Sequence, residues 1–440
     1  MVSGKLKLRI TILAAILFTA NIYSQGKRSL SIDECINIGL KNSNVLHSSK
    51  MSMQYANAKS NEADTYRLPT LTFGASYTRL SEVDPFSITT PFGTFDIAPS
   101  ILNNYNMKLS LQQPIFTGFK LESTSKIAEY NYLAAKEDFS KEEKELVYNI
   151  KNSYWGLFKA NQLKIVTGEN VAQVQAHLTD VQNLFEQGLA TKNDVLKVQV
   201  QLGEAQLRLI DTKNAVKLAN INLDNVLGIS LSTDIETTEK VDKQISETED
   251  LSTLLSTAYD KRPELKSIDY RVKASETGIT AAKADWWPQL YLTGNYYYSR
   301  PNQRIQPAKD EFNGTWDVSL SLSFNLWNWG ATGDRTDAAE AQYEQVKDNQ
   351  KIIKDAITLE VTRNFLDINK SKEKMTVAEQ NVNQAEENFR ITDEKFKNGL
   401  ALNSDLLDAE VALLQAKTNY IQSVVDYELA KAQLNKSIGE

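Results

Sequence analysis

The segment FEQGLATKNDVL (185–196) returns later in the chain as FKNGLALNSDLL (396–407), with an offset of 211 residues (396 − 185). When the same offset is applied to residues 185–228, 14 of the 44 aligned positions are identical. Chance would give about three identities over that length. The chain therefore contains an internal repeat. In each copy, Gly-Leu-Ala predicts a tight turn between two helices.

The upstream parts of the two copies also match, at an offset of 219 residues. LPTL (68–71) aligns with WPQL (287–290), and the first copy holds eight more residues (219 − 211) in a loop at 82–104. The sequence predicts a signal peptide at 1–24, a first repeat at 25–228, a connector at 229–250 and a second repeat at 251–440. Each repeat is predicted to run helix, strand, strand, long helix and helix. In the first repeat these elements lie at about 31–66, 70–80, 105–115, 119–187 and 193–227. In the second they lie at about 250–286, 289–299, 315–327, 333–398 and 404–437.

The predicted strands alternate between apolar and polar residues. In 316–325, Trp316, Val318 and Leu320 alternate with Asp317 and Ser319. This period fits either a sheet half-buried on a soluble core or membrane strands with lipid on one side and water on the other. Strand lengths of about ten residues and aromatic residues at the strand ends favour the membrane. These aromatic residues are Phe116, Phe119, Trp286, Trp287, Trp327 and Trp329.

Four strands are too few to close a membrane barrel, and an open edge in lipid leaves backbone groups unpaired. The strands therefore have to be completed by further copies of the chain. The helix at 193–227 carries a heptad seam that begins at Val195 and Val198, and the second copy repeats it from Leu406. These patterns predict a mainly α fold with a membrane β-barrel, in which long coiled-coil helices form a column capped by strands.

Composition argues against several classes of function. Cys35 is the single cysteine, and His47 and His177 lack metal-ligand spacing. We interpret both histidines as ordinary helix residues, and we find no constellation for catalysis. The apolar stretch 10–20 follows three basic residues, as in a secretory signal. Its removal takes the formal charge from −7 to −10 (−7 − 3), which disfavours a nucleic-acid partner.

The sequence closely resembles the TolC-type outer-membrane efflux channel family over essentially the whole mature chain. The resemblance rests on the duplicated plan, the opening LSIDECINIGLKNSNV (30–45), the strand exits QPIFTGF (113–119) and FNLWNWG (324–330), and the repeated Gly-Leu-Ala turns. It implies a homotrimer with one twelve-stranded barrel in the outer-membrane lipid and a hollow helical tunnel in the periplasm. It also implies a periplasmic adaptor (membrane fusion) protein and an inner-membrane transporter as partners, no cofactor, and passage of substrates without reaction, so the chain is not an enzyme.

Acidic residues follow each predicted turn. Asp405 and Asp408 share one face of the helix start. Their positions match the inner acidic ring of the family, which implies a pore constriction. In the first copy Asp194 matches the first acid, but Lys197 replaces the second. A simpler interpretation is that acids near a helix N-terminus favour the helix dipole.

The turns themselves are candidate adaptor-docking tips. Gly188 and Gly399 are expected to adopt positive φ. The residues that follow them are expected to be exposed, and three copies in a ring would form the adaptor footprint; they are Leu189, Ala190, Leu400 and Ala401. The competing hypothesis is a secreted coiled-coil scaffold or adhesion protein with water-soluble sheets.

Overall fold

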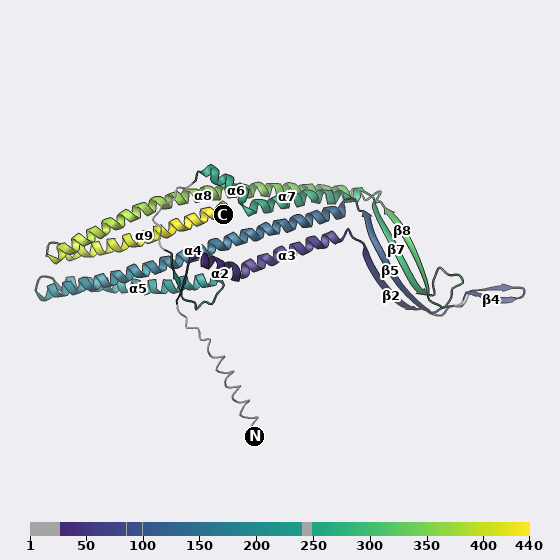
Figure 1. The fold of residues 1–440 in the computed structure, drawn as a ribbon, viewed down its shortest axis with the longest axis horizontal. Helices are drawn as coiled ribbons and strands as arrows, with labels where there is room; N and C mark the ends of the chain where they lie inside the picture. Colours follow the sequence, from purple (N-terminus) through teal and green to yellow (C-terminus); the bar gives the residue numbers. More distant parts are fainter. Residues whose placement is uncertain (1–26, 85, 99, 240–248) are drawn as a thin grey trace, which may run out of the picture. The chain divides into compact units, whose positions relative to one another are not determined.

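A computed structural model describes residues 27–84, 86–98, 100–239 and 249–440 (Figure 1). The predicted signal peptide lies outside the described residues. By internal contacts the chain divides into two units, each drawn from both repeats. One unit comprises the described parts of Met1–His47, Glu142–Arg262 and Ile357–Glu440, and the other comprises Ser48–Lys141 and Pro263–Ala356.

Four strands of the second unit form one antiparallel sheet in the order β2-β5-β7-β8. The alternating residues give the strands one apolar and one polar face, as predicted, although Tyr291 and Tyr297 interrupt the polar face of β7. The two hairpins have the same register, since Leu71 opposes Leu111 in the first and Leu290 opposes Leu322 in the second. The strands are β2 (Thr70–Arg79), β5 (Asn103–Phe116), β7 (Gln289–Arg300) and β8 (Asn313–Ser323).

Two helical hairpins follow the sheet strands in sequence (Figure 1). Their members are α4 (Lys120–Glu186) with α5 (Lys192–Leu227), and α8 (Ala331–Lys397) with α9 (Asn403–Ser437). The heptad seam is buried in both short helices: Val198 and Leu223 have no exposed surface, and Leu406 is 2% exposed. These observations confirm the duplicated helix-strand-strand-helix-helix fold. Among the described residues, no helix combines the length and apolarity needed to cross a membrane.

Two helices predicted to be continuous are broken. The first gives α2 (Ile32–Asn42) and α3 (Asn44–Thr65), since the Ser43 hydroxyl accepts a hydrogen bond from the Leu46 N–H and restarts the helix. The other gives α6 (Leu251–Lys261), α7 (Pro263–Ala282) and the short η1 (Lys283–Trp286). Pro263 causes this break because a residue before proline prefers extended backbone, and Arg262 has ψ 124°.

Four short strands appear where loops or connectors were expected. The loop at 82–104 contains a hairpin of β3 (Phe86–Thr90) and β4 (Gly93–Ala98). The connector contains β6 (Ile235–Thr237), which pairs in parallel with β1 (Arg28–Leu30). The expectation of four strands per chain therefore holds only for the main sheet.

The β1–β6 pair covers a core within the first unit. Cys35, Ile150 and Tyr154 are fully buried there, and the Tyr154 hydroxyl donates to the Leu30 carbonyl oxygen at 3.0 Å. Burial raises the pKa of the Cys35 thiol to about 12, so this thiol stays protonated and inert. The core anchors the first half of the connector to α4.

Candidate functional site: the helical tips and the exposed sheet

Both helical turns are closed by the same C-terminal cap. Gly188 and Gly399 have φ of 73° and 71°, and a Cβ added at either position would meet no atom within 4 Å. The N–H of Leu189 donates to the Leu184 carbonyl oxygen and the N–H of Leu400 to that of Lys395, both at 2.8 Å. Glycine is thus favoured here by its backbone conformation and not by crowding.

The residues after the glycines differ in exposure. Leu189 and Leu400 are 73% and 78% exposed. Ala190 and Ala401 are partly buried, which corrects the expectation that they lie exposed. Their methyl groups pack against an apolar cluster that α4, α5, α8 and α9 share, so each turn folds its alanine inward. The most exposed large apolar side chain of each tip is thus its leucine, with Phe185 at 41% beside Leu189 and Leu402 at 69% beside Leu400.

Two of the three candidate constriction acids bind the start of their own helix. The Asp194 carboxylate accepts from the Thr191 N–H at 3.0 Å and from the Thr191 hydroxyl at 2.6 Å, and these hydrogen bonds lower the pKa of Asp194. Asp405 accepts from the Leu402 N–H at 3.1 Å. Within the described chain, Asp408 is exposed and makes no hydrogen bond or ion pair. The helix-start interpretation therefore fits Asp194 and Asp405, and Asp408 is the carboxylate left for other contacts.

A buried pair near the tips was missed by the sequence analysis. His177 on α4 and Glu410 on α9 are 4% and 1% exposed, and Nδ1 lies 3.2 Å from Oε1. The distance is that of an ion pair, but the angles are not those of a hydrogen bond. Phe396 of α8 places its ring edge-on to the imidazole, with centroids 5.2 Å apart. The pair joins the two hairpins. The sequence gives one signal for this pair, which is a difference between the copies. The positions equivalent to His177 and Glu410 hold Asn388 and Gln199, and neither of these side chains is ionisable.

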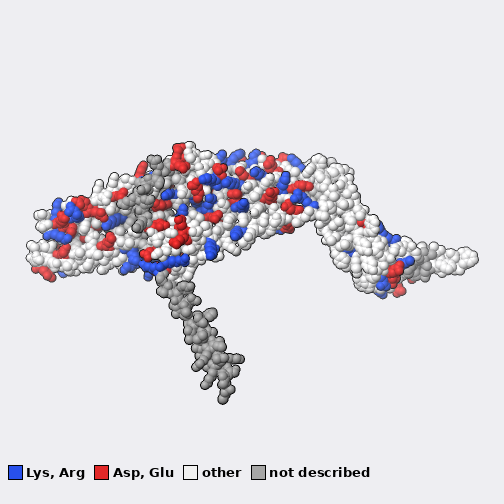
Figure 2. All heavy atoms as spheres, in the orientation of Figure 1, with Lys and Arg blue, Asp and Glu red and all other residues white. Residues whose placement is uncertain are grey.

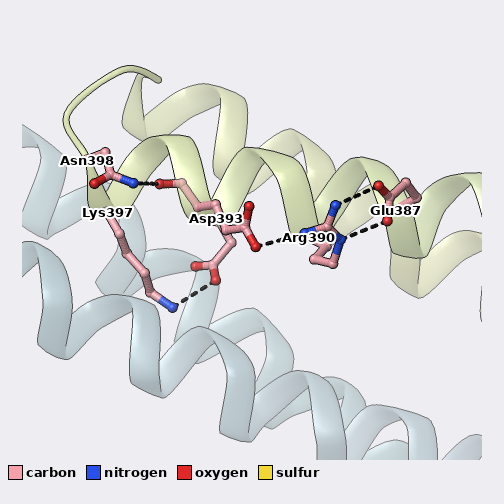
Figure 3. A network of polar contacts seen from close by, with 6 residues as sticks. Glu387, Arg390, Asp393, Lys397 and Asn398 are labelled. Carbon is pink, nitrogen blue, oxygen red and sulfur yellow. Dashed lines mark hydrogen bonds and ion pairs between the residues drawn. The ribbon is translucent and has the colours of Figure 1, made fainter.

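The last turns of α8 carry a ladder of ion pairs that the first hairpin lacks (Figure 3). Arg390 donates to both oxygens of Glu387 and to Glu394, and Lys397 pairs with Asp393 at 2.8 Å. Exposed pairs of this kind contribute about 0.2–1 kcal/mol each. The equivalent residues of α4 are uncharged except for Glu186. The second tip is therefore the more strongly charged of the two.

No described residue of the chain covers the apolar face of the sheet. Phe73, Trp316 and Leu320 are between 65% and 69% exposed, and Figure 2 shows the strands largely free of charged residues. A sheet half-buried on a soluble core would have hidden these side chains. This face resembles the lipid-facing side of membrane strands.

The other face of the sheet is polar and internally hydrogen-bonded. The Asn295 amide donates to Asp317 at 2.8 Å, and its oxygen accepts from the Ser110 hydroxyl at 2.7 Å. A cavity of about 500 Å³ opens on this face, and Arg304 and Tyr105 belong to its lining. A face of this composition suits contact with water.

The candidate interface aromatics gather where the strands meet the helices. Phe116, Phe119 and Trp287 pack edge to face with centroids 5.3–6.4 Å apart, and Trp327 lies 5.8 Å from Trp329. These aromatic residues form a belt that faces outward. Five of its side chains are each at least 47% exposed: Phe119, Trp286, Trp287, Trp327 and Trp329. Such a belt is typical of a membrane–water boundary.

Two left-handed residues directly precede the long helix of each copy. They are Gly118 and Phe119 in the first copy, and Trp329 and Gly330 in the second. Glycine and an aromatic residue thus exchange places between the copies. A Cβ at Gly118 would lie 2.3 Å from the Ala284 carbonyl oxygen, whereas a Cβ at Gly330 would meet no atom within 4 Å.

A family model described as "Outer membrane efflux protein" matches residues 36–229 and 254–440. The chain belongs to the outer membrane efflux protein family. It is 24% identical over 377 residues to the alkaline protease secretion protein AprF of Pseudomonas aeruginosa, covering 83% of this chain and 76% of that protein. It is 23% identical over 314 residues to the outer membrane protein TolC of Vibrio cholerae, covering 71% and 72%.

Solved structures share the fold of this efflux protein. CusC superposes with a TM-score of 0.80 at 17% identity, covering 93% of this chain and 92% of that one. VceC of Vibrio cholerae gives 0.78 at 17% identity, covering 93% and 96%. The protein is an outer-membrane export channel of the TolC type, with its helical part in the periplasm. No group of three or more potential metal-binding residues occurs in the part of the chain that the structure describes.

Proposed function

We propose that three copies of the chain form one conduit, in which their strands close a twelve-stranded barrel and their helices line a tunnel. The uncovered apolar face of the sheet supports this proposal most strongly, because a face such as that of Leu320 is stable only against lipid or another apolar surface. The outer strands β2 and β8 each have one partner, so the sheet is incomplete in a single chain. The number three follows the family resemblance.

The tunnel narrows at the helical tips, and Asp408 acts there as a ring of three carboxylates. Its carboxylate is exposed and uncommitted, and a ring of acids in a narrow pore attracts cations and repels anions. Asp405 has a double role, because it holds the start of α9 while adding charge beside the ring. Asp194 acts mainly as a cap in the first hairpin.

The exposed Leu189 and Leu400 are the contacts for a periplasmic adaptor protein, which links the channel to an inner-membrane transporter. Six leucines in a ring would present a repeated apolar footprint, where one exposed leucine would mean little. Ala190 and Ala401 contribute indirectly by fixing each turn against the tip cluster. Cargo passes through without chemical change.

Single-channel recording in planar bilayers tests the constriction. We expect Asp408→Asn to weaken cation selectivity and block by multivalent cations, and Asp405→Asn/Asp408→Asn to weaken both further. Asp211→Asn, an exposed acid in the middle of α5, is the matched control and should leave selectivity unchanged. Equal selectivity in all variants rejects the acidic ring, and failure of the parent protein to conduct rejects the conduit itself.

The scaffold hypothesis predicts a protein that dissolves without detergent. Membrane fractionation separates the two functions, since a channel stays in the outer-membrane fraction. The family match and the exposed apolar sheet both favour the channel.

A further inference from the structure

The apolar face of the main sheet ends in two arginines at the loop end of the strands. Side chains two residues apart lie on the same face of a strand. Arg79 therefore continues the face of Phe73 and Tyr77 on β2, and Arg300 continues the face of Tyr298 on β7. Figure 2 shows charged side chains at this end of the sheet. Neither arginine has a role in the conduit as proposed so far.

The length of the apolar face places these arginines at one boundary of the membrane. Leu290 lies opposite Phe116 of the aromatic belt at the helix end, and Arg300 follows it by ten residues (300 − 290). Ten residues of strand measure about 33 Å, which at the usual tilt of about 35–45° spans about 23–27 Å across the membrane. Outer-membrane barrels present an apolar band about 25 Å tall. Arg300 therefore lies where the hydrocarbon ends.

Aromatic rings surround Arg300 on this face. Its guanidinium carbon is 5.8 Å from the ring centroid of Tyr105 and 5.9 Å from that of Phe312. The Tyr105 ring also lies 5.0 Å from that of Tyr77, and the Phe312 ring stacks on Tyr298 at 5.1 Å. These rings form a second aromatic group, at the opposite end of the strands from the first belt. Aromatic residues mark both boundaries of a membrane barrel, so this group marks the outer one.

Both guanidinium groups keep most of their donors for a ligand. Arg79 donates one hydrogen bond, from Nη1 to the Asn103 side-chain oxygen at 2.8 Å. Arg300 donates two to the Asp310 carboxylate, from Nε at 2.8 Å and from Nη2 at 2.9 Å. Each guanidinium carries five N–H groups, so these contacts within the described chain use three of ten. The remaining donors suit an acceptor with several oxygens.

We propose that Arg79 and Arg300 bind the phosphate groups of outer-leaflet glycolipids on the lipid-facing side of the channel wall. The helical part of the channel lies in the periplasm, so the loop ends of the strands face the outer leaflet, whose glycolipids carry phosphate. A guanidinium binds phosphate through paired hydrogen bonds. A lipid also supplies acyl chains for the apolar face beneath, which free phosphate does not. This inference rests on the proposed conduit, because it requires that face to meet lipid, and it adds the headgroup recognised there.

The register of the sheet allows one headgroup to reach both arginines. Arg79 lies opposite Asn103 on β5, and Arg300 lies opposite Tyr105 on the other side of the same strand. Two strand spacings and two residues along the strand place their Cα atoms about 12 Å apart. A disaccharide headgroup and two arginine side chains span that distance.

Binding of diphosphoryl lipid A to the purified full-length channel in uncharged detergent tests the site. We expect Arg79→Gln and Arg300→Gln each to weaken binding about tenfold, because each removes charge-assisted hydrogen bonds. Lys108→Gln is the matched control, since Lys108 lies on the polar face over the Tyr297 ring, and it should bind as the parent does. Dephosphorylated lipid A should bind about as weakly to the parent as diphosphoryl lipid A binds to the two arginine variants.

Asp310 separates lipid recognition from a clamp on the loop. If the Arg300–Asp310 pair only holds the loop after β7, Asp310→Asn should weaken lipid binding, as Arg300→Gln does. If Arg300 binds phosphate, Asp310→Asn removes a competing carboxylate and should tighten binding about threefold. Opposite shifts in the two variants support the inference, and losses in both overturn it.

The remaining outcomes distinguish this inference from the proposed function. Each variant must first conduct in planar bilayers as the parent does. In a conducting channel, equal affinity for lipid A with and without phosphate, or equal affinity of all variants, overturns lipid recognition and leaves the conduit intact. Displacement of lipid A by an equal concentration of inorganic phosphate shows a free-anion site and also overturns it. A parent protein that does not conduct overturns the proposed function.

Discussion

His177 Nδ1 lies 3.2 Å from Glu410 Oε1, and the two side chains are almost completely buried between the first and second helical hairpins. Removing one member of such a pair leaves the polar atoms of the other buried without a partner, which costs about 1–3 kcal/mol. We expect Glu410→Leu to lower the free energy of unfolding by this amount, and His177→Leu/Glu410→Leu to recover most of it. Denaturant unfolding of the purified protein measures both.

The exposed pair between Arg390 and Glu387 supplies the control for that experiment. Glu387→Leu should change the free energy of unfolding by no more than about 1 kcal/mol. The single variant His177→Leu completes the cycle. If its loss and that of Glu410→Leu simply add in the double variant, the two residues are not coupled.

Asp224 predicts a dependence of stability on pH. Burial raises the pKa of this carboxyl from 3.8 to about 6. As the pH rises from 3.8 to 6, the unfolded chain loses the proton first, so the folded state becomes less stable, and above pH 6 the loss is complete. Asp224→Asn removes this loss. We expect the variant to gain up to about 3 kcal/mol over the parent between about pH 4 and pH 7.

Unfolding free energies at several pH values check that gain. Glu236→Gln, which changes an exposed acid on β6, should follow the parent at every pH. A constant difference between Asp224→Asn and the parent across the acidic range contradicts the assignment.

The two faces of β8 should respond differently to the same charge. Leu320 lies on the uncovered apolar face, and Ser321 lies on the polar face. We expect Leu320→Arg to cost about 2–4 kcal/mol near the middle of the bilayer and to reduce the amount of assembled protein in the outer membrane. Ser321→Arg should assemble normally. Similar assembly of both variants would mean that the apolar face does not meet lipid.

Alanine substitutions at two glycines measure separately the cost of a left-handed backbone and the cost of steric crowding. Gly118 and Gly330 both have positive φ, so alanine at either position costs about 1–2 kcal/mol. Only Gly118→Ala also drives a Cβ to 2.3 Å from the Ala284 carbonyl oxygen. We expect Gly118→Ala to lower the melting temperature much more than Gly330→Ala. Equal shifts would show that the backbone at Ala284 moves aside.

Periodicity made most of the fold predictable. Heptad spacing identified residues such as Val195, Val198 and Leu406, all at most 3% exposed. Alternation identified the strands to within two residues, except at the end of β8, which was expected to reach 327 and ends at Ser323. Both signals arise because burial on one face repeats at the period of the backbone.

Features that depend on single residues or distant contacts escaped prediction. Pro263 breaks a helix that its neighbours favour, and the Ser43 hydroxyl restarts another. Strand β1 has only three residues, and its partner β6 lies in the distant connector between the repeats. The partner of Glu410 also depends on which helices meet, because His177 lies on α4. Asp405 binds Leu402 at the start of its own helix, but its position in the sequence fits a capping acid and a pore-facing acid equally well.

Among the residues that the structure describes, the β3–β4 hairpin occurs in the first copy only, and Phe92 at its turn is 92% exposed. In the proposed ring of three chains, the strands would approximate six-fold repetition, but this hairpin would recur only once per chain. The outer mouth would then display three aromatic projections at alternate positions. Antibodies, phages or other agents that approach the cell from outside would encounter a rim with true three-fold character, although the wall beneath it would be nearly six-fold.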